Sequence, residues 1–385
     1  MTGARVQGRW LPEMFVAIVL VLVAYGALIT YTTSVYYAQD VFGNRLYFLQ
    51  RELLWVTLGV LAALLAYCVH YQVVQKLSAF LFVATIALLV LVLLPGVGRS
   101  VNNAARWLSY GGFTLQPSEV AKYALIIFVA KWLSVRRRHV HRFFRNTVLL
   151  LLLTAVPLGL ILKEPDLGTP VVIGATIVIM LFVGGVPWRH LLWIGLCAIP
   201  PLIALVWMVP YRLRRLVVFL NPDADPLNTG FQIRQSLIAI GSGKINGLGL
   251  GMSVQKMHYL PEAHTDFAFA IIGEELGFVG AAMTILLFLL FFYTMYRLTL
   301  HIQDMFGHLV AVGIMSILAL QTIINIGVVT GCLPTKGLAL PFISYGGSSL
   351  VMTLAACGLL LNIVHNQRNL RVDTGALRGY DETIV

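Results

Sequence analysis

Long apolar runs recur along the whole chain, and each is long enough to cross a lipid bilayer. About ten are expected, at residues 14–34, 52–70, 77–95, 118–135, 147–162, 168–186, 190–209, 266–296, 309–330 and 342–364. A transmembrane helix needs about 20 mainly apolar residues, and in lipid it satisfies its own backbone hydrogen bonds. Only 11% of the 385 residues are charged, against roughly a quarter in ordinary soluble proteins. The sequence therefore predicts an all-α, polytopic integral membrane protein with about ten transmembrane helices.

The positions of the basic loops predict the topology. Arg5 and Arg9 precede the first apolar run, as in a signal peptide, but that run is too long and lacks a small-x-small cleavage site, so we expect an uncleaved span. With the N-terminus inside, the short basic loops 136–145, 188–190, 296–301 and 365–371 all become cytoplasmic, as the positive-inside rule requires. The sequence predicts a cytoplasmic tail 1–13, a membrane domain 14–365 with a large outer loop 210–265, and a cytoplasmic tail 366–385.

Several other classes of site are excluded by pattern. The net charge is +11, but the basic residues lie between the apolar runs. Membrane topology and contact with anionic lipid explain their positions better than binding to nucleic acid does. The four cysteines have no paired spacing, and neither a disulfide framework nor a zinc site is indicated. "GSGK" (241–244) is not a phosphate-binding loop, since Ile238 and Ile245 replace the required Gly and Ser or Thr. We expect no nucleotide and no resident metal site.

The first outer segment, 95–119, leads into a span through "QPSEVAK". Glu119 and Lys122 are three residues apart and share one helix face, which fits an intrahelical ion pair. Arg106 and Lys122 are also cations on the outer side, where topology gives no reason to place them, so an anionic partner is the alternative.

The stretch "LPEAHTDFAFAIIGEELGFVGA" (260–281) places carboxylates at the start of a span. Asp266 lies at the water boundary, where it caps the helix or reaches a substrate. Glu274 and Glu275 lie ~12–13 Å further along at 1.5 Å per residue, deep enough that we expect helix-packing or gating carboxylates. Glu262 and His264 are expected in the loop.

Two further outer segments complete the set. Arg214, Arg215 and Lys256 surround a glycine-rich stretch, 241–251, whose backbone could present amide N–H groups to an anion. "LPTKGLALPFISYGGSS" (333–349), with Ser344, is irregular backbone before the last span and suggests a cavity wall. These pieces suit an amphiphile with an anionic head group, and they fit an enzyme and a transporter equally.

The motifs, in register, resemble one known family. "RW" followed by "QPSE..K", then "PDLGT", "GFQIRQSLIAIGSG", "VQK..YLPEAHTDFAFAIIGEELG" and "LPTKGLALPFISYGGSS" closely resemble the SEDS proteins of bacterial shape, elongation, division and sporulation, over roughly residues 10–365. The division branch is the most similar, and the sporulation and elongation branches are close.

The resemblance implies a peptidoglycan glycosyltransferase of the bacterial inner membrane. It would polymerise lipid II at the outer face during cell division, together with a class B penicillin-binding protein and other division proteins. A sugar hydroxyl would attack the anomeric carbon of a second lipid II with inversion, which needs one base and no covalent intermediate.

The family's essential aspartate matches Asp266, which we expect to be the base, and Glu119 is the second candidate. Charge on the departing diphosphate would be offset by Arg106, Lys122, Arg214, Arg215 and Lys256, and a divalent cation could share that task. The remaining expected substrate contacts are Trp107, Gln116, Ser118, Glu262, His264 and Ser344. The alternatives are a lipid II flippase and a non-enzymatic division scaffold.

Overall fold

The computed structural model describes residues 10–381 apart from 102–103, 111–112, 140–142, 222–224, 226–228 and 258. Most of the expected N-terminal tail and the last four residues of the C-terminal tail lie outside the described residues.

Ten apolar helices form the body of the described chain, and they correspond one to one with the expected runs. They are α2 (Leu11–Phe42), α3 (Tyr47–Cys68), α4 (Tyr71–Leu93), α5 (Pro117–Val135), α6 (Leu149–Lys163), α7 (Gly168–Val183), α8 (Trp188–Trp207), α11 (Ala268–Thr299), α12 (Met305–Val329) and α13 (Gly347–Asp381). Eight segments are long and apolar enough to cross a membrane, while α7 is shorter, at 16 residues, and α5 carries three charged side chains. The predicted all-α, multi-pass membrane fold is confirmed.

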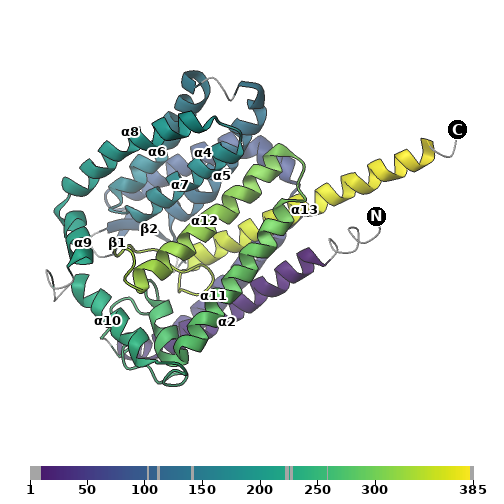
Figure 1. Ribbon diagram of the computed structural model, residues 1–385. Coiled ribbons are helices and arrows are strands. Elements are labelled where there is room, and N and C mark those ends of the chain that lie inside the picture. Colours follow the sequence, from purple (N-terminus) through teal and green to yellow (C-terminus); the bar gives the residue numbers. More distant parts are fainter. Residues whose placement is uncertain are drawn as a thin grey trace.

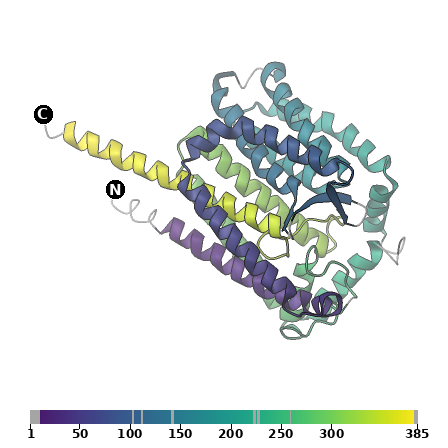
Figure 2. The same cartoon turned by 180° about the vertical axis from the view of Figure 1, so that it is seen from behind.

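Successive helices alternate in direction, so their connections fall at two ends of the bundle. Short connections, including the 3-10 turn η1 (Arg137–His139) and the π-helical turn η2 (Phe143–Val148), lie at the end where α2 begins and α13 ends (Figures 1 and 2). The expected basic loops share this end. The connections 43–46, 94–116, 164–167, 208–267 and 330–346, of which three are long, gather at the opposite end, which we call the loop face.

The loop face has secondary structure that the apolar pattern did not predict. Strands β1 (Gly98–Val101), β2 (Ala104–Tyr110) and β3 (Phe113–Leu115) form an antiparallel sheet in the order β1-β2-β3. The expected loop 210–265 contains two helices, α9 (Pro210–Leu220) and α10 (Thr229–Ser242). The loop face is therefore a built surface above the bundle.

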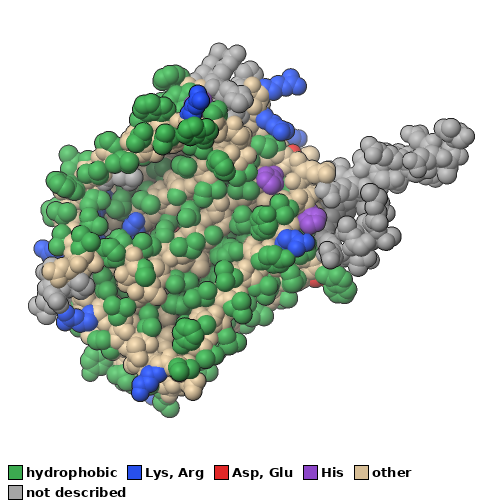
Figure 3. Space-filling view, viewed as in Figure 1, with side chains coloured by type: hydrophobic (Ala, Val, Ile, Leu, Met, Phe, Trp, Pro, Cys, Tyr) green, Lys and Arg blue, Asp and Glu red, His purple; other side chains and the backbone are tan. Residues whose placement is uncertain are grey.

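Packing separates an inner from an outer set of helices. The inner set includes α12 and α13, whose most apolar stretches are largely buried, whereas no described side chain of α8 is buried. Large apolar side chains cover the exterior (Figure 3), among them Leu65, Phe80, Phe182, Phe278 and Met283. Such a surface is unfavourable in water and suits a lipid environment.

Several helices are longer than a bilayer requires, α2, α11 and α13 among them. Both α2 and α11 have 32 residues, about 48 Å at 1.5 Å per residue, against a hydrocarbon core of about 30 Å. Non-helical backbone at Gly277 divides α11, and the part after it, 278–299, alone measures about 33 Å. Glu274 and Glu275 precede this break, so they lie nearer the loop face than the sequence led us to expect.

Candidate active site

Asp266 lies on the loop face, two residues before α11. The backbone turn before it is closed by Glu262, whose carbonyl accepts hydrogen bonds from the amides of Thr265 (3.2 Å) and Phe267 (3.3 Å). The amide nitrogen of the Asn325 side chain, on α12, donates to the carbonyl of Asp266 at 2.9 Å. The main chain at Asp266 is therefore fixed to a buried helix.

The carboxyl group of Asp266 faces the loop that precedes α13. A Cβ placed on Gly337 would lie 3.2 Å from Oδ2 of Asp266, so glycine leaves room for the carboxyl there. The same Asn325 nitrogen also donates to the carbonyl of Leu338 at 2.7 Å. Asn325 thus holds the two segments together.

Four charged residues act on Asp266. Its pKa is raised to about 7: burial is the largest cause, Glu262 and Asp166 also raise it, and the positive charges of Arg215 and Arg106 lower it. A pKa close to the working pH suits a group that accepts a proton in a reaction. Asp266 and these four residues come from four separate parts of the chain.

The two arginines also organise the loops around Asp266. Arg106, on β2, donates from Nε to the carbonyl of Glu164 (2.9 Å) and from Nη2 to that of Pro165 (2.6 Å). Arg215, on α9, donates from Nη1 to the carbonyl of Thr335 at 3.0 Å. Both guanidinium groups therefore combine a structural role with a positive charge near Asp266.

The connection between α6 and α7 adds carboxyl groups that sequence reasoning did not assign to the site. Asp166 caps α7, accepting from the amide (3.1 Å) and the hydroxyl (2.7 Å) of Thr169. Glu164 is buried, and neither oxygen of its side-chain carboxyl group has a hydrogen-bond partner among the described residues. The Glu164 pKa is raised to about 8, chiefly by burial and also by Asp166, while Arg106 opposes the rise. The sequence feature that could have identified Glu164 and Asp166 is the presence of two acidic residues in an outer connection of only four residues.

Lys336 is a third residue that was missed. Burial lowers its pKa and the nearby Asp166 opposes that effect. Its chain neighbour Gly337 is the residue that faces the Asp266 carboxyl. The sequence feature that could have identified it is a lysine between Thr335 and Gly337, in a loop that is otherwise uncharged.

The Glu119–Lys122 pair forms as the intrahelical alternative predicted. The Lys122 Nζ lies 2.7 Å from Glu119 Oε2, both side chains are buried, and Nζ also donates to Gln321 Oε1 at 3.2 Å. Gln321 in turn donates from Nε2 to the carbonyl of Ala339 at 2.9 Å. Whether Lys122 also binds an anion stays a prediction.

One face of α12 joins the two constellations. Gln321 and Asn325 are four residues apart, so they share that face. They bond successive carbonyls, those of Ala339 and Leu338. Glu119 and Asp266, the two expected bases, thus lie on either side of the same loop segment.

The other expected residues of the first constellation support the start of α5. The amide of Gln116 donates to Ser348 Oγ at 3.1 Å, which ties α5 to α13. Ser118 is buried and its hydroxyl has no hydrogen-bond partner within the described residues. Trp107 is half-buried and pairs across the sheet with Arg99.

Glu262, His264 and Ser344 frame the site in different ways. Glu262 is exposed and accepts from the Thr265 hydroxyl at 2.9 Å, while Ser344 Oγ accepts the amide of Leu340 at 2.9 Å, so Ser344 closes a turn. The His264 ring stacks on Tyr37, with centroids 5.4 Å apart. Burial lowers the His264 pKa, opposed by Glu262.

Arg214 is exposed, but Lys256 is buried and paired elsewhere. Its Nζ lies 2.7 Å from Glu275 Oε1, and neither side chain is accessible. The structure therefore does not bring Lys256 to the group of charges around Asp266.

The carboxyl groups around Asp266 do not form a metal-binding site by themselves. Among the described residues, no group of three or more His, Cys, Asp or Glu side chains is arranged to hold a metal ion. A divalent cation here would take its further ligands from substrate phosphates, as Mg²⁺ commonly does.

Known proteins resemble this chain over nearly all of its length. Stage V sporulation protein E of Bacillus subtilis is 43% identical over 355 residues, which is 92% of this chain and 97% of that protein. The probable peptidoglycan glycosyltransferase FtsW of Geobacter metallireducens is 43% identical over 342 residues, 89% of this chain and 91% of that protein.

Solved structures agree with the sequence relatives. One, described as showing structural coordination of polymerization and crosslinking by a peptidoglycan synthase complex, matches with a TM-score of 0.75 at 33% identity, covering 92% of this chain and 97% of that one. The rod shape determining protein RodA of Thermus thermophilus matches with a TM-score of 0.68 at 30% identity, covering 92% and 96%. The family model described as cell cycle protein matches residues 12–369, and the chain belongs to this FtsW/RodA/SpoVE family.

Proposed function

We propose that this protein is a peptidoglycan glycosyltransferase that polymerises lipid II at the outer face of the bacterial cytoplasmic membrane. Relatives of more than 40% identity carry the name peptidoglycan glycosyltransferase. In this proposal the loop face is extracytoplasmic and both termini are cytoplasmic.

The observation that carries the proposal is the placement of Asp266. Its carboxyl lies on the loop face, where a head group of an amphiphile would sit while the tail remains among the helices. With a pKa raised to about 7, it accepts a proton more readily than an ordinary aspartate, which is largely ionised and weakly basic at neutral pH.

In the reaction, Asp266 takes the proton from the acceptor sugar hydroxyl. The hydroxyl oxygen forms its bond to the anomeric carbon of the donor, and the bond from that carbon to the lipid diphosphate breaks. One base and direct displacement invert the configuration. Arg106, Arg215 and Lys336 supply positive charge where the diphosphate gains negative charge.

A flippase would need polar groups along the whole depth of the membrane. The buried charged side chains in the described spans are Glu52, Glu119, Lys122, Glu274 and Glu275, and every one lies in the first three turns from the loop face. Such a distribution favours chemistry at one surface over transfer across the bilayer.

The partner is proposed to be a class B penicillin-binding protein in cell division. The support is the similarity to a peptidoglycan synthase complex and to the proteins named FtsW.

The test is purified protein with lipid II, with and without the partner, and with glycan chains as the readout. Asp266→Asn keeps the size of the side chain but cannot accept the proton, so we expect polymer formation to fall by at least about 10²-fold. Arg297→Gln, at the opposite end of α11, is the matched control and should polymerise normally.

Each outcome decides between the functions. Polymer from the wild type but not from Asp266→Asn supports the enzyme. Transfer of lipid II across vesicles without polymer favours the flippase. Undiminished polymerisation by Asp266→Asn would overturn the assignment of the base.

A further inference from the structure

The connection from α10 to α11 folds back onto the helix that it enters. In an unbroken helix the carbonyl of Glu274 would accept the amide of Phe278, but at the Gly277 break that amide donates to the carbonyl of Lys244 at 2.9 Å. The freed Glu274 carbonyl accepts the amide of Leu248 at 3.0 Å. Backbone hydrogen bonds between the loop and α11 thus replace the one that is missing inside the helix.

The glycines of this segment allow its backbone to approach the backbone of α11 closely. Gly249 donates its amide to the carbonyl of Glu275 at 2.9 Å, and any Cβ on Gly243 or Gly247 would overlap the α11 backbone. The expected role of this glycine-rich stretch as an anion cradle is wrong for Leu248 and Gly249, because their amides are already bonded. We call residues 243–267 the return segment.

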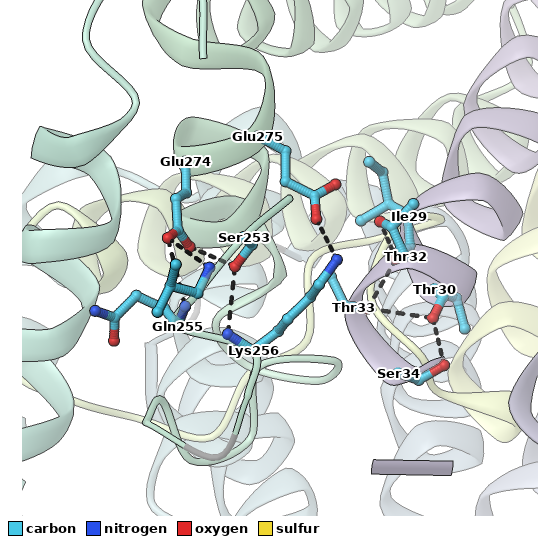
Figure 4. Close-up of polar contacts among 11 residues, drawn as sticks. Ile29, Thr30, Thr32, Thr33, Ser34, Ser253, Gln255, Lys256, Glu274 and Glu275 are labelled. Atoms are coloured by element: carbon cyan, nitrogen blue, oxygen red, sulfur yellow. Dashed lines mark hydrogen bonds and ion pairs between the residues drawn. The ribbon is translucent and has the colours of Figure 1, made fainter. Parts of the chain in front are cut away.

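The side chain of Glu274 then fixes the middle of the return segment (Figure 4). Its carboxylate accepts the amides of Val254 (3.0 Å) and Gln255 (3.4 Å) and the hydroxyl of Ser253. A carboxylate with several such donors is well stabilised inside protein.

The side chain of Glu275 holds the next residue. It pairs with the Lys256 Nζ at 2.7 Å (Figure 4), with side-chain exposures of 1% and 0%. The same Nζ lies 5.5 Å from the centre of the Tyr36 ring of α2. A buried charge pair of this kind is costly to break from one side, because the remaining charge is left without compensation.

From Lys256 the chain has only a short path to Asp266. The amide of Leu260 donates to the carbonyl of Gln255 at 2.8 Å, and Leu260 is buried. The turn at Glu262 follows, and α11 begins at Ala268. The stretch that carries Asp266 is therefore attached to α11 at both ends, once through Glu275 and once by covalent continuity.

We propose that Lys256 and Glu275 are positioning residues for Asp266. Their ion pair shortens the loop that ends at Asp266, which lowers the number of conformations open to the base. This inference rests on the proposed function, and it replaces direct contact of Lys256 with the diphosphate.

The experiment is a double-variant cycle with Lys256→Met, Glu275→Met and both together. Each single change leaves one buried charge alone, so we expect kcat for lipid II polymerisation to fall by about 10- to 100-fold with little change in KM. The double variant replaces the pair by two apolar side chains of similar length, whose packing can hold the same two segments together, so it should recover most of the lost kcat. Lys244→Met is the control, since Lys244 is an exposed cation on the same segment.

A substrate-binding Lys256 gives the opposite pattern. Lys256→Met would then raise KM, and the double variant would be equally impaired. That pattern, or folded single variants with normal kcat, would overturn the proposal. If the methionine variants do not fold, Glu275→Gln, which keeps the size and an acceptor for Lys256, is judged by the same criterion on kcat.

A second readout does not depend on activity. Hydrogen exchange of amides 253–267 should be faster in Lys256→Met than in the wild type and slow again in the double variant, while α12 is unchanged. A wild type that makes no polymer but shows this exchange pattern would refute the proposed function and leave the link between the pair and this segment intact. Unchanged exchange would refute that link.

Discussion

At the scale of single residues, Asp266 lies between opposing charges. Burial, the largest effect, and the charges of Glu262 and Asp166 favour its neutral form, whereas Arg215 and Arg106 favour its ionised form. Its pKa of about 7 is therefore a balance, and changing one neighbour should move it in a known direction.

The pH dependence of kcat/KM tests this balance. The base must be ionised, so the rate should rise with pH through about 7 and then level off. Glu262→Gln removes a charge that raises the pKa and should move the acid limb to lower pH. Arg215→Gln removes a charge that lowers it and should move the limb to higher pH.

Opposite shifts are the diagnostic result of these two profiles. Arg297→Gln, far from the site, should leave the limb in place. An acid limb near pH 4 in the wild type, or shifts of the same sign in both variants, would contradict the role of Asp266.

Residues also show how far the sequence could predict the site. Asp266 and Arg106 were found because charge beside an apolar span is unusual. Lys336 and Glu164 were missed because their importance comes from burial and proximity, which are three-dimensional. Lys256 was expected near the substrate because its partner, Glu275, lies 19 residues away, on a helix whose break no periodicity shows.

At the scale of elements, hydrophobic length predicted the ten apolar helices but not the sheet. The strands β1 and β3 have four and three residues, too short for alternation to be a signal. Their arrangement depends on pairing with β2, for example of Gly98 with Leu108. Such pairing between separate segments cannot be predicted from the residues of a short stretch of sequence.

The break in α11 leads to a prediction about Gly277. Its φ of 68° and ψ of −164° belong to a region that is essentially restricted to glycine, and a Cβ there would overlap the return segment. We expect Gly277→Ala to destabilise the protein by about 1–3 kcal/mol and to lower activity, as read by thermal unfolding in detergent.

The matched control is Gly174→Ala on α7, where a Cβ meets nothing within 4 Å. This change should leave stability unchanged or slightly raised, because alanine favours helix. Equal unfolding temperatures for Gly277→Ala and the wild type would show that the break is not fixed by this residue.

At the scale of the whole molecule, the two ends of the helix bundle differ in charge. The charged side chains that are buried in the described spans lie close to the loop face, and the expected basic loops lie at the other end. Positive loops indicate the cytoplasmic side, so this asymmetry predicts a loop face exposed to the outside.

The native cysteines offer a direct measurement of that orientation. Cys332 is exposed on the loop face, Cys68 is exposed at the opposite end of α3, and Cys357 is buried in α13. Variants that retain one cysteine each should react differently with a charged, membrane-impermeant maleimide. We expect Cys332 to react in intact spheroplasts, Cys68 only after permeabilisation, and Cys357 only after denaturation. Reaction of Cys68 in intact spheroplasts would reverse the topology and place Asp266 on the cytoplasmic side, where the proposed polymerisation could not occur.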